Sequence, residues 1–201
     1  MLCVRILGLS LWMAMVVLLP LSGQTIVHVA LGPESFLKIS GLTNVNSFCL
    51  TYGVHKDILT LSPQFSLGEK RSHHVQNANL HVPLERFVTA NAAMKEEFLL
   101  LLQEKTYPNI LISVGSIQAD SISTTRINGY AEVKITLAGV TRNYTIKFQS
   151  AALDQNLVAT GHQILNMRDF NLVPPTRLFG LVQVKENIAI DFQLYIVLLS
   201  P

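Results

Sequence analysis

The sequence has little cysteine and little charge. Of its 201 residues only Cys3 and Cys49 are cysteines, and 14% are Asp, Glu, Lys or Arg. Beyond the apolar first 23 residues only Cys49 remains, so an internal disulfide is excluded there and stability has to come from packing. Its neighbours include no basic residue that would activate the thiol, and we interpret Cys49 as buried. A formal net charge of +2 also gives no electrostatic signature of a nucleic-acid partner.

Catalytic signatures are missing as well. The sequence has no G-x-S-x-G, H-E-x-x-H, P-loop or C-x-x-C motif, and no G-x-G-x-x-G after a strand. His73 and His74 lack the Asp, Glu or Cys spacing of a tetrahedral metal site, which favours a solvated loop. Arg168 and Asp169 could form an ion pair at the barrel mouth or contact a lipid head group, although adjacent residues more often serve turn geometry. We therefore expect no enzyme, no metal and no other cofactor.

One long apolar run stands at the start of the chain. Arg5 precedes the apolar residues 6–19, and the segment ends at Gly23 before Gln24. This pattern is typical of a secretory signal peptide. A retained signal anchor is the alternative, although a spanning helix needs ~20 apolar residues. We expect residues 1–23 to be removed, residues 24–201 to form one domain, and the product to be periplasmic or secreted without a stable membrane span.

The chain is rich in segments in which apolar and polar residues alternate. Successive side chains of a strand point to opposite faces, so such segments have one apolar face against a core. The closing segment has its apolar residues at Ile188, Ile190, Phe192, Leu194, Ile196 and Leu198. Other alternating segments are 25–31, 36–39, 48–52, 80–85, 110–114, 130–137 and 143–149. Eight or so such strands predict an all-β fold with an antiparallel sheet, closed into a barrel or folded as a strongly curved sandwich.

One helix interrupts the strands, and one hairpin is well defined. Asn91 is a good N-cap for a helix over residues 92–105, which Pro108 is expected to end. Its apolar face is predicted to consist of Met94, Phe98, Leu101 and Leu102. The hairpin is predicted within residues 130–149, with a connection at 138–142.

Four blocks of sequence carry a family resemblance. They are 41–48 (GLTNVNSF), 91–94 (NAAM) leading to 105–110 (KTYPNI), 137–142 (LAGVTR), and 169–172 (DFNL) followed by Pro174 and Pro175. In this order they resemble the YceI-like family of exported bacterial proteins, and Bacteroidetes-type members in particular. The resemblance spans residues 36–198 and implies an eight-stranded, lipocalin-like antiparallel barrel. Such members are expected to have a second cysteine two residues before Asn91. Here that residue is Thr89, so no disulfide of Cys49 is carried over.

The resemblance also implies a long apolar tunnel that holds a polyisoprenoid or similar lipid tail. Alternation alone leaves the interior undecided, because an eight-stranded barrel can hold a ligand or be filled by side chains. The candidate ligand-binding residues are the inward apolar side chains Phe98, Leu102, Ile112, Val133, Ile135, Ile146, Phe148, Phe170, Phe192 and Leu194. The even face of residues 188–198 is predicted to form an inner wall.

The leading hypothesis is therefore an exported protein whose partner is a long-chain isoprenoid or another amphipathic lipid. One alternative is an envelope structural or stress-response partner protein with a filled barrel and no ligand. Another is an envelope hydrolase, for which the sequence offers no polar constellation. The oligomeric state is left undecided, a homodimer included.

Overall fold

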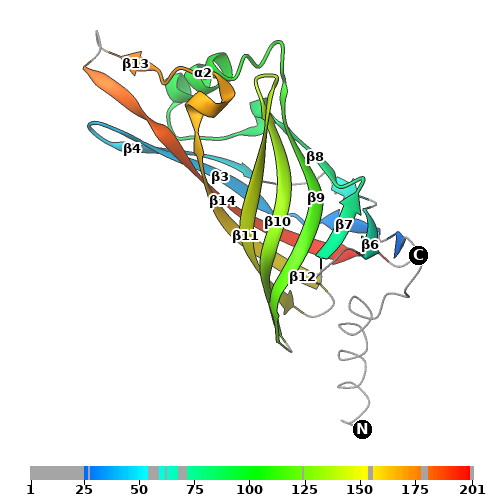
Figure 1. Ribbon diagram of the computed structural model, residues 1–201. Coiled ribbons are helices and arrows are strands. Elements are labelled where there is room, and N and C mark those ends of the chain that lie inside the picture. The colour runs from blue at the N-terminus through cyan, green and yellow to red at the C-terminus, as the bar shows by residue number, and fades with distance from the viewer. Residues whose placement is uncertain are drawn as a thin grey trace.

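The computed structural model describes residues 25–26, 28–53, 59–61, 63–67, 72–123, 125–153, 156–177 and 181–199 (Figure 1). The strands there are β1 (Thr25–Ile26), β2 (Val29–Leu31), β3 (Phe36–Thr43), β4 (Ser47–Gly53), β5 (Leu59–Leu61), β6 (Gln64–Leu67), β7 (Ser72–Gln76), β8 (Asn79–Pro83), β9 (Asn109–Ile122), β10 (Arg126–Leu137), β11 (Val140–Leu153), β12 (Asn156–Asn166), β13 (Thr176–Arg177) and β14 (Val182–Leu198). The helical elements are the 3-10 helices η1 (Leu84–Arg86) and η2 (Met167–Phe170) and the α-helix α2 (Ala92–Leu101). The predicted signal peptide lies outside the described residues.

Eight strands form the wall of an antiparallel barrel, in the order β4-β3-β14-β12-β11-β10-β9-β8. The seam between the two ends of this order is joined by a β-bridge. Thr51 in β4 and Val88, shortly after β8, each donate a backbone N–H to the other's carbonyl at 2.9 Å. The prediction of an all-β, lipocalin-like antiparallel barrel with one helix is confirmed.

Short strands extend the sheet at the end of the barrel away from α2. β2 pairs with the C-terminal end of β14, and β5 pairs with β2. β7 pairs with the second half of β9 and connects it to β6 and β1. His73 and His74 belong to β7, so their prediction as a solvated loop is wrong. The cross-strand pairing of His73 with Ile117 holds them in the sheet.

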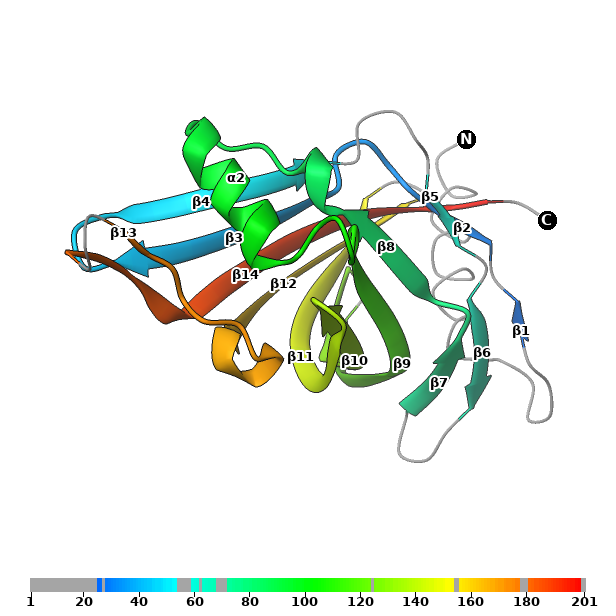
Figure 2. The same cartoon turned by 90° about the horizontal axis from the view of Figure 1, so that it is seen from above.

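The helix α2 lies over the other end of the barrel (Figure 2). Asn91 is its N-cap as predicted, and its side-chain oxygen accepts a backbone N–H of the first turn at 3.3 Å. The helix ends at Leu101, earlier than predicted, because Gln103 adopts a left-handed conformation with φ 53°. The N–H of the next residue then donates to the carbonyl of Leu99 at 3.0 Å, as in a Schellman cap. Pro108 is therefore not what ends the helix.

The hairpin between β10 and β11 has a much tighter turn than predicted. Leu137 pairs directly with Val140, which leaves only Ala138 and Gly139 as the connection. Both have positive φ, at 46° and 77°, as in the two-residue turns whose twist matches that of the flanking strands. The five-residue connection over 138–142 was therefore wrong, and both strands continue closer to the turn.

Cys49 is exposed on β4 with a free thiol, so its prediction as a buried residue is wrong. Leu50 and Tyr52 point into the barrel, and alternation places Cys49 on the outer face. Within the part of the chain that the structure describes, no helix is long and apolar enough to cross a membrane.

Candidate functional site

In the barrel interior, phenylalanine rings lie over glycines of neighbouring strands. Phe148 in β11 pairs with Gly129 in β10, and Phe192 in β14 pairs with Gly161 in β12. A Cβ atom added at either glycine would collide with the partner ring or with nearby backbone. Each ring therefore occupies the space that a glycine leaves, and it packs sideways along the sheet.

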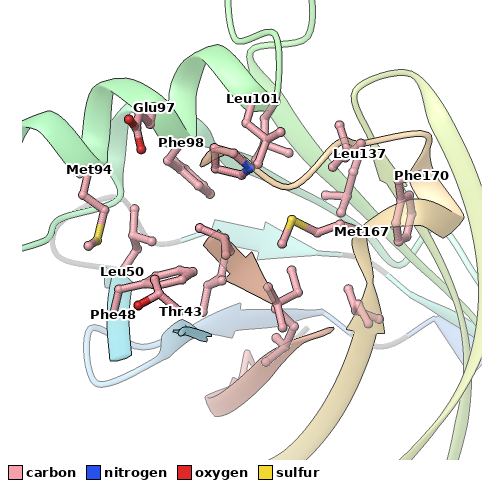
Figure 3. A pocket seen from close by; sticks show the side chains of 18 of the residues that line it. Thr43, Phe48, Leu50, Met94, Glu97, Phe98, Leu101, Leu137, Met167 and Phe170 are labelled. Carbon is pink, nitrogen blue, oxygen red and sulfur yellow. The ribbon is translucent and has the colours of Figure 1, made fainter. Parts of the chain in front are cut away.

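Toward α2 the interior is hollow, with a cavity of ≈ 420 Å³ (Figure 3). Its wall is built from six barrel strands (β3, β4, β9, β10, β12 and β14), from α2 and from the segment that includes η2. The apolar lining residues are Leu37, Ile39, Val45, Phe48, Leu50, Met94, Phe98, Leu101, Leu102, Ile110, Ile112, Ile135, Leu137, Leu165, Met167, Phe170, Leu172, Pro175, Val182, Val184, Ile188 and Ile190. The polar ones are Thr43, Asn46, Asn91, Glu97 and Asn166. Cavities of ~300–1,000 Å³ with such linings are typical of small-ligand sites.

The helix α2 forms the roof of this cavity because its apolar face is turned to the barrel. Met94 and Phe98 point from the helix toward Phe48 and Leu50 of β4 below (Figure 3). The ring of Phe98 lies 5.1 Å from that of Phe87, which is fully buried beside the seam. Aromatic pairs at this separation add to the stabilisation from burial, so the roof is packed firmly on one side.

The 3-10 helix η2 closes the cavity on another side. Phe170, 1% exposed, is fixed by stacking against Tyr144, with ring centroids 6.2 Å apart. Burial raises the pKa of Tyr144 above its usual value, and the carboxylate of Asp169 raises it further. The Tyr144 hydroxyl and the Asp169 carboxylate are 3.5 Å apart. This contact ties η2 to the barrel wall and so positions the lining residues Met167 and Phe170.

Arg168 and Asp169 do not line the cavity. Arg168 donates from Nε to Glu186 Oε1 at 2.9 Å, on the outside of the barrel. Both residues lie in the turn of η2, and Asn166 caps that turn by accepting the Arg168 N–H at 2.8 Å. The contacts favour the turn-geometry interpretation over a head-group contact.

The cavity reaches the surface beside the turn between β3 and β4. Val45, Asn46 and Asn91 are exposed and yet belong to the lining. Thr43 shapes the turn, since its hydroxyl oxygen accepts the backbone N–H groups of Val45 at 3.1 Å and Asn46 at 2.9 Å. The opening therefore lies between this turn and the start of α2, with polar groups at its edge and apolar side chains behind.

Five of the ten sequence-predicted lining residues line the cavity. Those that line the cavity are Phe98, Leu102, Ile112, Ile135 and Phe170, whereas Val133, Ile146, Phe148, Phe192 and Leu194 do not. Val133 and Ile146 are buried in the same core, and Phe148 and Phe192 lie over glycines. Contact of any of these residues with a ligand stays a prediction.

Residues of β3, β4 and the segment after η2 also line the cavity but were not singled out as ligand-binding residues. Leu37, Ile39, Phe48 and Leu50 alternate along their strands, so their inward orientation had a signal in the sequence. The segment from Leu172 onward is irregular and has no such periodicity.

The chemistry of the site suits the burial of an apolar ligand. The described residues of its lining are almost all apolar, and Glu97 is the one charged residue among them. Among the described residues, no group of three or more His, Cys, Asp or Glu side chains could hold a metal ion. A long apolar group fits such a site, with a polar end at the edge.

Comparison with known proteins gives consistent results. The model of the YceI-like domain matches residues 39–196. A polyisoprenoid-binding domain from Saccharophagus degradans superposes with a TM-score of 0.60 at 11% identity, covering 87% of this chain and 100% of that one. Burkholderia cenocepacia BcnA gives 0.55 at 16% identity, with 80% and 96% covered. The Campylobacter jejuni YceI protein gives 0.51 at 12% identity, with 73% and 83% covered. A search of the curated proteins found no match.

Proposed function

The chain belongs to the family of YceI-like domains, and from this membership we propose that it is an exported protein that holds a polyisoprenoid or other long-chain amphipathic lipid in its barrel. The observation that carries the proposal is the apolar cavity of ≈ 420 Å³ between α2 and the strands. The structurally similar domain from Saccharophagus degradans is described as polyisoprenoid-binding, which supports the choice of ligand class.

The energetics of such a site depend on the number of methylene groups that it removes from water. Each buried CH₂ contributes ~0.8 kcal/mol, so even a short part of an isoprenoid tail supplies appreciable affinity. The edge residues Asn46 and Asn91 offer side-chain amide groups to a polar end, whereas the Thr43 hydroxyl is engaged within the turn. The ligand would thus lie with its tail under α2 and its polar end near the turn between β3 and β4.

Export is supported by the sequence of residues 1–23, with Arg5 followed by an apolar run and small residues before Gln24. A periplasmic or secreted carrier would hold the apolar tail of its lipid away from water. The proposal includes no cofactor, no nucleic acid and no catalytic step.

A filled barrel acting only through its outer surface is the competing function. It requires side chains to occupy the whole interior, as the rings of Phe148 and Phe192 occupy the space beside Gly129 and Gly161. The hollow region under α2 favours binding over this alternative.

The test is extraction of the protein purified from its native envelope, with mass spectrometry of the lipids that accompany it. We expect a long-chain lipid, and we expect the recovered chain to begin near Gln24. A chain without bound lipid that also takes up no isoprenoid after mild delipidation would refute the binding proposal. Recovery of the chain from the cytoplasm with residues 1–23 intact would refute export.

A further inference from the structure

The end of the barrel beside α2 has an unusual share of the exposed aliphatic side chains. Among the described residues, five of the six most exposed large apolar residues lie there, at 58–76% exposure. They are Leu42, Val45, Leu100, Val173 and Leu181, which we call the rim. Figure 2 shows the segments that carry them, namely α2, the turn between β3 and β4, and the chain after η2, around one end of the barrel.

The rim meets the cavity at Val45. Val45 is 67% exposed and also lines the cavity, so apolar surface extends from the outside of the molecule to the interior. Exposed apolar surface around an opening of this kind marks an interaction site, whereas scattered single residues need no explanation.

The part of the rim at the turn between β3 and β4 is held in a defined shape. The Asn44 side chain donates to the carbonyl of Leu181 at 2.7 Å and accepts the backbone N–H of Gln183 at 3.0 Å. The backbone N–H of Asn44 donates to the carbonyl of Gln183 at 3.1 Å. These bonds fix Val45 and Leu181 on one tip while their side chains face solvent.

We propose that the rim docks onto the surface of a lipid bilayer, so that a lipid passes directly between the membrane and the cavity. The inference rests on the proposed function for its cargo. A long apolar tail that passes through water is exposed to it, which is unfavourable in free energy. Contact between the opening and the bilayer avoids this exposure. Energetic centres of protein interfaces are enriched in Trp, Tyr and Arg, whereas all five rim residues are Leu or Val. This composition favours a hydrocarbon surface as the partner.

The test uses flotation of the full processed chain with vesicles of phosphatidylcholine, because an aliphatic rim requires no anionic lipid. The rim variant is Leu42→Ser combined with Leu181→Ser, two rim residues that do not line the cavity. Its matched control is Ile122→Ser combined with Leu153→Ser, two exposed apolar residues at the far ends of β9 and β11. We expect the rim variant to partition at least about tenfold more weakly, the change that ~1.4 kcal/mol produces, and the control to partition like the wild type.

Lipid binding in detergent solution separates the docking inference from the proposed function. A rim variant that binds isoprenoid in detergent like the wild type, but no longer floats with vesicles, supports docking. A wild type that binds no lipid in detergent and still floats through its rim refutes the proposed function and leaves docking intact. Docking is overturned if the wild type does not float, if the rim variant floats equally well, or if the control loses as much. A protein partner would then be the better occupant of the rim.

Discussion

A pair of identical substitutions tests where the barrel is hollow. Ile135 in β10 and Ile146 in β11 are 7% and 8% exposed, and both belong to the same core. Only Ile135 lines the cavity. Replacement of each by Trp adds the same volume to two equally buried positions, so the surroundings alone decide the outcome.

The expected magnitudes differ because the two positions have different free space. The cavity of ≈ 420 Å³ has room for on the order of ten water molecules at ~30 Å³ each, and therefore accommodates an indole. We expect Ile135→Trp to change the free energy of unfolding by less than about 1 kcal/mol. Overpacking of a filled core costs ~1–3 kcal/mol, which is the loss expected for Ile146→Trp.

The affinity for lipid should change more in Ile135→Trp than in Ile146→Trp, the reverse of the order for stability. An indole at Ile135 displaces the volume of two or three methylene groups, and at ~0.8 kcal/mol each the affinity falls roughly ten- to fiftyfold. Ile146→Trp should bind with the affinity of the wild type wherever it is folded. The location of the cavity would be refuted if both variants lost the same stability, or if Ile135→Trp kept full affinity.

Urea unfolding and fluorescence titration measure both quantities on the same samples. The only tryptophan of the sequence is Trp12, so a chain of residues 24–201 contains none. The introduced indole is therefore the sole tryptophan signal. At residue 135 its emission should be typical of an apolar environment and should respond to added lipid, whereas at residue 146 the response to lipid should be absent.

Two further substitutions test local features of the fold. Gln103→Gly should raise the free energy of unfolding by ~1 kcal/mol, because glycine adopts the left-handed conformation at the end of α2 without a Cβ penalty. Thermal unfolding measures this gain. An unchanged or lower melting temperature would contradict the cap geometry. Asp169→Asn should lower the pKa of Tyr144 in an ultraviolet titration while leaving it above 10.0, because burial is the larger cause of the shift. In the wild type the raised pKa contributes stability that is full below the unfolded pKa of 10.0 and is lost as the pH rises through the folded pKa. A Tyr144→Phe variant should lack this alkaline loss, and an equal loss in that variant would assign it to other groups.

Much of the architecture could be predicted from local pattern. Alternation along residues 188–198 identified a strand with one buried face, and Ile188 and Ile190 do line the cavity. The N-cap at Asn91 and the apolar face of α2 also follow from periodicity. These features depend on residues a few positions apart, and such spacing is visible in one sequence.

The C-terminal end of α2 was beyond such reasoning. It depends on the left-handed conformation of Gln103, which non-glycine residues rarely adopt. Nothing in the sequence around Gln103 indicates this conformation. The exposure of Cys49 is a different case. Alternation with Leu50 and Tyr52 already assigns it to the outer face, and the expectation of a buried thiol gave the residue type too much weight.

The placement of phenylalanine rings over glycines depends on register, and register depends on turns. The two-residue turn at Ala138 and Gly139 sets Gly129 opposite Phe148, whose ring then lies over the glycine. The predicted five-residue connection would set Gly129 opposite Ala151. A shift by an odd number of residues exchanges the faces that cross-strand partners share, so the ring over glycine could not be anticipated.

The pairing of Gly161 with Phe192 was even harder to predict from the sequence, because β12 and β14 are separated by η2 and β13. A connection of that kind fixes its register through tertiary contacts, which include the stacking of Phe170 on Tyr144. Apolar alternation therefore specifies which residues face inward, whereas cross-strand register decides which phenylalanine lies over which glycine. The same pairing occurs on the cavity wall, where the ring of Phe48 in β4 lies over Gly41 in β3.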